Sequence, residues 1–200
     1  MSDTADLDSY YPSTCPFCTI ASAFPCASST SASTTLSSAV PSEEAADPTR
    51  VDPNAFVLLS APEVLAFLDI LPMTRGHVLV ASRTHRKKVA DLEGAEASEV
   101  GFWLPLLART VAKVTGVTDY NIVQNNGPRA AQVIPHVHFH IIPRPASLPQ
   151  VAHKSWTMFG RGQRDELDDE DGAKLAREMR GVLREEVGRV EGRGRGRGKL

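Results

Sequence analysis

Three histidines lie within one short stretch of this chain, residues 134–144, and alternate there with apolar residues. They are His136, His138 and His140. In an extended strand, side chains two residues apart share a face at a spacing of about 7 Å, so the three imidazoles would line one side of the strand. An imidazole has an ordinary pKa of about 6.5 and is a usable nucleophile, base or ligand near neutral pH. The stretch therefore predicts a site for a phosphate or a metal ion; the alternative is an exposed, half-polar strand without a chemical role.

A second group with chemical potential lies near the start, where two residues separate Cys15 from Cys18. This Cys-x-x-Cys spacing can direct two thiolates at one ion and so forms half of a tetrahedral zinc site. The same spacing is typical of redox-active cysteine pairs. Both interpretations stay open on spacing alone, because a zinc site needs two further ligands from other parts of the chain.

The composition is that of an ordinary globular protein. Of the 200 residues, 42% are hydrophobic and 23% are charged, and the formal net charge is −2, which argues against a general polyanion-binding protein. Three cysteines do not suit a secreted disulfide framework. The start lacks an apolar signal stretch, and no run approaches the roughly 20 apolar residues that span a bilayer. We therefore expect a cytoplasmic and/or nuclear protein without a membrane partner.

Three segments have compositions that argue against packed structure. We expect residues 1–14 to form a flexible N-terminus. Residues 27–53 are rich in Ser, Thr, Ala and Pro, cannot bury enough apolar surface to offset their ordering entropy, and are predicted to be a disordered insertion. Residues 192–200 form an Arg-Gly tail with four cations, which we expect to be flexible. This tail either contacts RNA weakly and in a salt-dependent way or is a solvated terminus without a role.

Apolar periodicity indicates the elements that must position the histidines. Residues 55–60 and 64–70 are apolar runs that predict a hairpin, and residues 77–82 and 119–124 predict two more strands. Helical spacing of apolar residues predicts a helix over residues 95–116.

Residues 151–191 are predicted to form an irregular segment and then a C-terminal helix with one apolar stripe. The order of elements gives an antiparallel sheet covered by a helix, which is an α+β fold.

The triad stretch resembles the signature of the histidine-triad (HIT) nucleotide-binding family, His-x-His-x-His followed by two apolar residues. The resemblance covers about residues 15–145, apart from the Ser/Thr-rich insertion. It implies a HIT domain over residues 15–150, built as a five-stranded antiparallel sheet with a packed helix, to which the C-terminal helix is added. Family members commonly dimerise through the long helix and the sheet edge, so the resemblance also implies a homodimer.

The resemblance assigns roles to the three histidines. His138 matches the family's nucleophile, which attacks the α-phosphate of a nucleotide and forms a nucleotidyl-histidine intermediate. Its proton would be held on the far ring nitrogen by the backbone carbonyl of His136. His140 would stand beside the phosphate or the leaving group as a hydrogen-bond donor.

Further positions match nucleotide-binding and metal-binding residues of the family. Asp69 matches a residue that contacts the ribose hydroxyls, and Asn125 and Gln132 match residues that hold the phosphates. One branch of the family also carries a structural zinc, and the matching ligands here are Cys15, Cys18, His85 and His136. We find no acidic cluster suited to magnesium, so no magnesium requirement is expected.

These matches favour an enzyme that cleaves at the α-phosphate of a purine nucleoside phosphoramidate or a dinucleoside polyphosphate. One departure supports an alternative. Where close family members often have Ser or Thr, three residues before the first histidine, this chain has Val133, which cannot donate a hydrogen bond to a leaving group. The alternative is a non-catalytic nucleotide sensor or scaffold. Nucleotidyl transfer to a sugar phosphate fits less well, because the enzymes that perform it carry Gln in place of His140.

Overall fold

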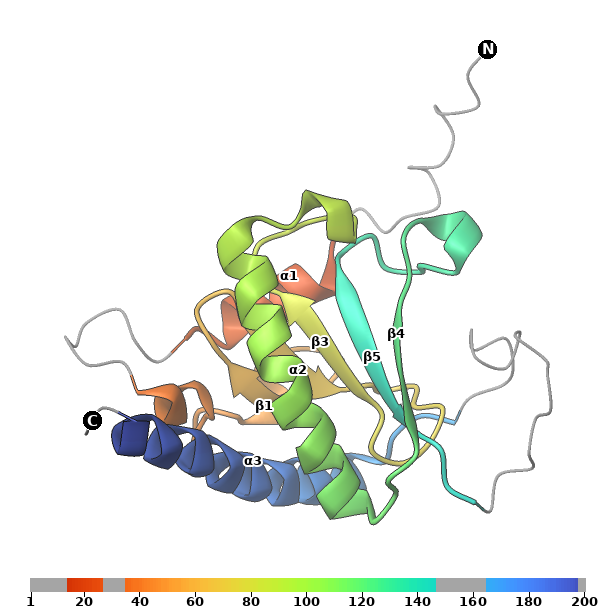
Figure 1. Cartoon of the computed structure of the whole chain (residues 1–200). Coiled ribbons are helices and arrows are strands. Elements are labelled where there is room, and N and C mark those ends of the chain that lie inside the picture. Colours follow the sequence, from red (N-terminus) through yellow and green to blue (C-terminus); the bar gives the residue numbers. More distant parts are fainter. Residues whose placement is uncertain (1–13, 27–34, 147–164, 198–200) are drawn as a thin grey trace.

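A five-stranded antiparallel sheet forms the centre of the computed structural model, which describes residues 14–26, 35–146 and 165–197. The strands lie in the order β1-β2-β3-β5-β4, so that β5 is inserted between β3 and β4. Their bounds are Val57–Ser60 for β1, Val64–Leu68 for β2, Val78–Ser82 for β3, Tyr120–Gln124 for β4 and His138–Pro143 for β5. The predicted α+β class and the five-stranded antiparallel sheet are confirmed (Figure 1).

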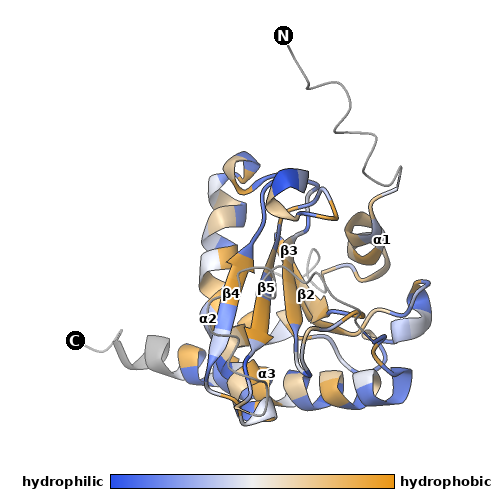
Figure 2. Cartoon of the chain, turned by 90° about the vertical axis from the view of Figure 1, so that its right-hand side faces the viewer, coloured by the Kyte–Doolittle hydropathy of each residue, from blue (hydrophilic) through white to orange (hydrophobic). Residues whose placement is uncertain are grey.

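Helices cover both faces of this sheet. Helix α2 (Gly94–Thr115) and helix α3 (Asp169–Arg197) pack on one face, and the short helix α1 (Pro16–Ala23) packs on the other (Figure 2). Along β2, Ala66 and Leu68 belong to the core under α2 and α3, whereas Leu65 and Phe67 pack with α1. Side chains alternate between the faces of a strand, and because both faces of β1, β2 and β3 are covered, all residues of these strands are buried.

Helix α2 begins and ends at residues suited to those positions. Glu93 and Glu96 form a capping box at its start, which satisfies backbone N–H groups that lack a partner within the helix. Gly116 ends it with φ +70°, a left-handed conformation that glycine adopts without steric cost. Two 3-10 turns, η4 (Val89–Asp91) and η5 (Pro128–Ala130), lie in the loops before α2 and before β5.

The predicted disorder over residues 27–53 is wrong for residues 35–53. We call residues 35–55 the strap. It contains the 3-10 turns η2 (Leu36–Ala39) and η3 (Pro48–Arg50), and it buries Ala39, Val40 and Ala46. The composition of the strap could not reveal its ordering, because its partners are cationic side chains on α3, more than 100 residues away. Residues 27–34 lie outside the described residues, as do residues 1–13.

Helix α3 is longer than predicted. The Arg-Gly repeat continues the helix as far as Arg197, so the expected flexible tail is wrong for residues 192–197. The predicted apolar stripe is buried through Leu175, Met179, Leu183 and Val187, and this packing stabilises the helix over these residues. Residues 147–164 and 198–200, which hold most of the expected irregular segment and the end of the tail, lie outside the described residues. Among the described helices, none is both long enough and apolar enough to cross a membrane.

Candidate active site

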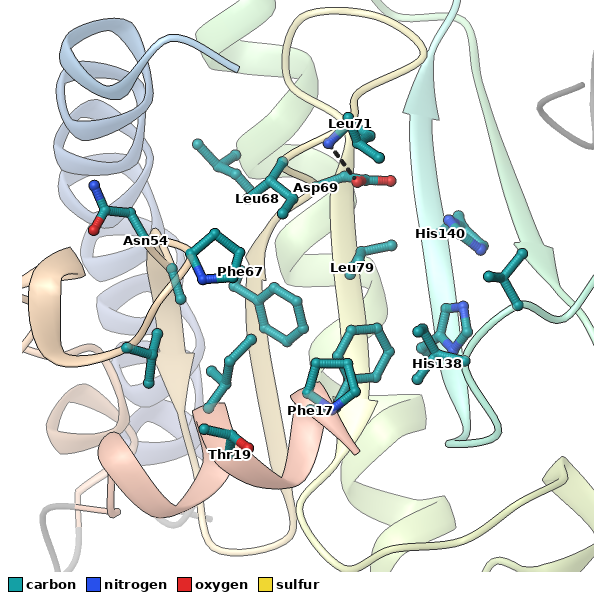
Figure 3. A pocket seen from close by; sticks show the side chains of 18 of the residues that line it. Phe17, Thr19, Asn54, Phe67, Leu68, Asp69, Leu71, Leu79, His138 and His140 are labelled. Carbon is teal, nitrogen blue, oxygen red and sulfur yellow. Dashed lines mark hydrogen bonds between the residues drawn. The ribbon is translucent and has the colours of Figure 1, made fainter. Parts of the chain in front are cut away.

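A cavity of about 650 Å³ lies on the α1 side of the sheet, and the triad strand β5 forms one of its walls. His138 and His140 line it from β5 (Figure 3). The opposite walls come from α1, from the end of the strap at residues 51–55 and from the β2–β3 connection at residues 69–73. Binding sites of this size accommodate a nucleotide-sized ligand.

His138 is held in one orientation at the start of β5. Its Nδ1 lies 2.6 Å from the backbone oxygen of His136. A carbonyl oxygen can only accept, so Nδ1 carries the proton and Nε2 keeps its lone pair. His138 is 5% exposed, and burial lowers its pKa below the ordinary value, although the hydrogen bond to His136 opposes this effect. The ring is therefore neutral at neutral pH, which a nitrogen nucleophile requires.

His140 belongs to a row of three polar side chains. Its Nδ1 lies 3.0 Å from Nε2 of His77, and Nδ1 of His77 lies 3.2 Å from Oδ2 of Asp69. The backbone N–H of Met73 also lies within hydrogen-bond distance of Nδ1 of His77, at 3.2 Å. The carboxylate of Asp69 can only accept and the N–H of Met73 can only donate, so the two contacts favour opposite protonation states of Nδ1 of His77. The proton between Nε2 of His77 and Nδ1 of His140 can therefore belong to either ring.

His77 was not predicted from the sequence as a site residue. The structure shows it almost completely buried, with 1% exposure. The residue comes directly before the buried strand β3, which pairs with both β2 and the triad strand. The signal that could have identified His77 is its place at the start of an apolar strand in a chain that has three further histidines on another strand.

Asp69 and Asn125 line the cavity, as predicted for nucleotide-binding residues. One carboxylate oxygen of Asp69 accepts the backbone N–H of Leu71 over 2.9 Å, which fixes the carboxylate in a turn (Figure 3). Asn125 is 9% exposed, and its Nδ2 lies 3.5 Å from the backbone oxygen of Ala131.

Gln132 differs from the prediction, because its amide is engaged within the protein. Its Oε1 accepts the backbone N–H of Gly127 over 2.6 Å, and its Nε2 donates to the backbone oxygens of Lys87 and His136 over 2.7 and 3.4 Å. It is 3% exposed. In this arrangement Gln132 supports the loop beside the triad and is not among the residues that line the cavity.

The other end of the cavity is apolar. Phe17 from α1 meets Phe67 edge to face, with ring centroids 5.2 Å apart, and its ring also lies 5.1 Å from that of His138. Ile20 and Leu79 also line this end; Figure 3 labels Leu79, Phe17 and Phe67. We call it the apolar slot; its flat aromatic and aliphatic walls suit a planar base. Phe17 was not predicted from the sequence as a site residue, because it lies within the Cys-x-x-Cys motif and the motif indicates only a metal or redox site.

The four predicted zinc ligands, Cys15, Cys18, His85 and His136, lie together. Their ligand atoms are all within 4.8 Å of one another. Nδ1 of His136 is 3.3 Å from Sγ of Cys15 and 3.6 Å from Sγ of Cys18, and Nδ1 of His85 is 3.3 Å from Sγ of Cys18. Tetrahedral zinc bonds of about 2.0–2.3 Å place ligand atoms roughly 3.3–3.8 Å apart, so the donor set and its spacing fit a closed zinc site.

The protonation of this cluster also suits a metal. Nε2 of His136 lies 2.7 Å from the backbone oxygen of Ser82 and donates to it, which leaves the lone pair of Nδ1 directed at the thiols. Burial lowers the pKa of His136 to about 4, so the ring is neutral. Burial and the neighbouring Cys15 raise the pKa of Cys18 to about 11, so a metal must displace a proton from this thiol.

Val133 stands at the mouth of the cavity with 76% exposure. From the sequence, the residue at this position was expected to reach the leaving group. An isopropyl group offers no hydrogen bond there.

Comparison with known proteins gives a consistent result. The family model described as "HIT domain" matches residues 51–147. An uncharacterized HIT-like protein from Methanocaldococcus jannaschii is 41% identical over 92 residues, which are 45% of this chain and 69% of that protein. The adenosine 5′-monophosphoramidase hnt1 of Schizosaccharomyces pombe is 46% identical over 81 residues; the match covers 40% of this chain and only 58% of that relative's length.

Solved structures agree with the fold. A Zn-bound histidine triad family protein from Mycobacterium smegmatis superposes with a TM-score of 0.53 at 26% identity, and the match covers 66% of this chain and 86% of that one.

Proposed function

Because the chain belongs to the histidine-triad (HIT) family, we propose that it is a nucleotide hydrolase or nucleotidyl transferase. Its substrate would be a purine nucleoside phosphoramidate or a dinucleoside polyphosphate, cleaved at the α-phosphate. The observation that carries this proposal is the hydrogen bond from Nδ1 of His138 to the His136 carbonyl, which leaves an unprotonated Nε2 on a cavity-lining side chain. The name of the fission-yeast relative supports the same chemistry.

The proposed reaction has two steps. In the first, the lone pair on Nε2 of His138 forms a bond to the α-phosphorus, and the bond from phosphorus to the leaving group breaks, with its electron pair going to the leaving group. The pair His77–His140 carries one extra proton in this step, stabilised by the carboxylate of Asp69. Nε2 of His140 gives a proton to the leaving group, and Nδ1 of His140 takes one from His77.

In the second step, a water oxygen attacks the phosphorus and the bond to His138 breaks, which returns the electron pair to Nε2. The proton lost by the water goes back to the His77–His140 pair. The nucleotide then leaves as a monophosphate, and the site returns to its first state.

The apolar slot determines how the base is recognised. Phe17, Ile20, Phe67 and Leu79 offer contact area but no hydrogen bond to a base edge, and the polar lining residues on this side of the cavity include Thr19 and Asn54. A pocket of this kind discriminates weakly between ligands that differ only in polar groups. We therefore propose that adenine and guanine nucleotides both bind, and that Asp69 bonds the ribose hydroxyls.

We propose that zinc, held by Cys15, Cys18, His85 and His136, is a structural ion. With four protein ligands the site is closed and has no position for substrate. His136 belongs to both sites: its ring faces the thiols and its carbonyl holds the proton of His138. Bound zinc would anchor α1 and fix this carbonyl, and it takes no part in the reaction.

We propose a homodimer formed through the edge of the sheet at β4. In the part of the chain that the structure describes, β4 pairs only with β5. On β4, Tyr120 and Ile122 are 40% and 47% exposed, so this edge offers both backbone groups and apolar surface to a second copy. Light scattering on an Ile122→Glu variant should show a monomer if this edge is the interface.

Two further expectations stay proposals. We propose that the protein works in the cytoplasm and/or the nucleus, in line with its three unpaired cysteines. Weak RNA contact through the C-terminal cations is the second, and it would be seen as salt-dependent binding that is lost on removal of residues 193–200.

The alternative function, a nucleotide sensor or scaffold, is favoured by the exposed Val133. Incubation of the purified protein with adenosine and guanosine phosphoramidates, dinucleoside polyphosphates and nucleoside monophosphates separates the two functions. Release of a nucleoside monophosphate over many turnovers supports the enzyme. Tight binding of the monophosphate without turnover of any substrate would support the sensor instead.

A further inference from the structure

Helix α3 touches the segments that form two walls of the cavity, although none of its own residues lines it. These walls are the end of the strap, residues 51–55, and the first part of the β2–β3 connection, residues 69–73. The catalytic histidines stand on a third wall, β5. Figure 1 shows α3 running along the bottom of the molecule with the strap, in orange, beside it. The contacts of α3 therefore influence the positions of the two walls that would hold the nucleoside.

The strap is attached to α3 by a buried guanidinium. Arg180 is 3% exposed and donates through Nε and Nη2 to both carboxylate oxygens of Glu43, over 3.2 and 2.7 Å. Its Nη1 donates to the backbone oxygen of Val57 over 2.8 Å. One side chain thus joins α3, the strap and β1. A bidentate pair of this kind has a defined geometry that a lysine cannot reproduce.

Further hydrogen bonds within the strap connect the attachment at Glu43 to the wall of the cavity. Arg184 donates to the backbone oxygen of Pro41 over 2.6 Å. Beyond Glu43, Arg50 donates to the backbone oxygen of Glu44, and the N–H of Ala55 donates to the backbone oxygen of Pro48. These bonds fold residues 44–55 into a compact turn, and the last five of these residues line the cavity.

The second wall is attached near the start of α3. The N–H of Leu167 donates to the backbone oxygen of Ile70 over 2.9 Å, and Arg75 pairs with Asp171 over 2.7 Å. Ile70 follows Asp69, the residue placed at the ribose. The two walls that would contact the base and the ribose are thus held by the same helix.

We propose that α3 is a brace for the nucleoside-binding half of the cavity, and that Arg180 and Glu43 are positioning residues for nucleoside binding. This inference rests on the proposed function. The brace sets the affinity for the nucleoside, while the reacting groups on β5 keep their geometry when it is loosened, because His138 is held by His136 and not by α3.

The test compares Glu43→Ala and Arg180→Lys with a matched variant on the same helix, Glu186→Gln. Glu186 is also 3% exposed and also pairs with cations, but these are Arg109 and Lys113 on α2 and Arg189 on α3, none of which lies in either wall. Glu43 has a half-exposed side chain, so its variant should fold even if the Arg180 variant does not. Each protein is measured for AMP affinity by calorimetry, for KM and kcat on an adenosine phosphoramidate, and for Tm.

We expect AMP affinity to fall and KM to rise about five- to tenfold in Glu43→Ala and Arg180→Lys, with kcat within twofold of the wild type. Glu186→Gln should lower Tm and leave AMP affinity and KM unchanged. Equal losses of affinity in all three variants, or no loss in the first two, would overturn the brace. A wild-type protein that neither binds AMP nor turns over a phosphoramidate would overturn the proposed function as well, so the two failures are distinguishable.

Discussion

At the scale of single residues, the site is organised by which nitrogen of each histidine carries a proton. The carbonyl of His136 fixes the proton of His138 on Nδ1, whereas Nδ1 of His77 meets both the carboxylate of Asp69 and the N–H of Met73. A backbone group therefore sets the role of the nucleophile, and the row Asp69–His77–His140 can change its protonation. Small changes at His77 should alter the reaction without removing the nucleophile.

His77→Gln tests the proton-transfer role of this residue. Gln retains a hydrogen-bonding group but cannot shuttle a proton, so kcat on a phosphoramidate should fall roughly 10- to 100-fold, as for loss of a general acid. KM should change little, because His77 does not line the cavity. Steady-state kinetics, with Tm as a control for folding, checks this. An unchanged kcat would remove His77 from the mechanism.

Val133→Ser tests the departure at the cavity mouth. A hydroxyl there can donate to a leaving group, and one hydrogen bond is worth about 0.5–1.5 kcal/mol, so kcat on an adenosine phosphoramidate with an alkylamine leaving group should rise up to about tenfold. Val133→Ala, which adds no donor, is the matched control and should leave kcat near that of the wild type. Equal rates in both variants would mean that this position does not reach the leaving group.

The sequence was informative about residues that belong to a spaced motif. The triad, Asp69 and the four predicted zinc ligands were selected in this way; His138, His140 and Asp69 line one cavity, and the ligand atoms of the four residues lie close together. His77 and Phe17 were missed because their significance depends on strand pairing and on the packing of α1. For Gln132 the position was identified but the direction of its amide, which faces two backbone carbonyls, was not.

At the scale of elements, regular apolar patterns predicted the strands, α2 and the buried stripe of α3. The strap shows where such reasoning stops. Its order comes from Arg180 and Arg184, which lie on an element distant in sequence, and local composition contains no record of such partners. Local composition likewise did not predict that α3 continues through the Arg-Gly repeat as far as Arg197.

Two glycines of α3 provide a paired test of its packing. A Cβ on Gly172 would lie 2.7 Å from the ring of Phe56, whereas a Cβ on Gly181 would meet nothing within 4 Å. Gly172→Ala should therefore lower the free energy of unfolding by about 1–3 kcal/mol through overpacking. Gly181→Ala should raise it by about 0.5–1 kcal/mol through helix propensity. Thermal or urea unfolding checks both, and stabilisation by Gly172→Ala would contradict the close packing of α3 on Phe56, the residue before β1.

At the scale of the whole molecule, the proposed zinc ligands Cys15, Cys18, His85 and His136 join α1 to the loop after β3 and to the residues before β5. Metal removal should therefore loosen one wall of the cavity. We expect a chelator to lower Tm by roughly 5–10 °C, equivalent to about 2–4 kcal/mol for a chain of this size. The raised pKa of Cys18 also determines how zinc affinity depends on pH. Zinc binding displaces the proton of this thiol, so the affinity for zinc should increase as the pH rises.

Cys18→Ser and Cys26→Ser provide the comparison for this prediction. Cys26 is not part of the cluster, so its variant should bind one zinc and respond to chelator as the wild type does. Cys18→Ser should lose zinc in elemental analysis and show no chelator effect. Equal zinc content in both variants would contradict the four-ligand site.

The central claim is that Nε2 of His138 becomes covalently bonded to the α-phosphorus. The most direct measurement is a rapid alkaline quench of the protein during turnover of an adenosine phosphoramidate, followed by mass spectrometry of the peptides. The account predicts one adenylyl group, located on His138, and its absence together with loss of turnover in His138→Ala. Turnover in that variant at the wild-type rate, or an adenylyl group on another residue, would contradict the account.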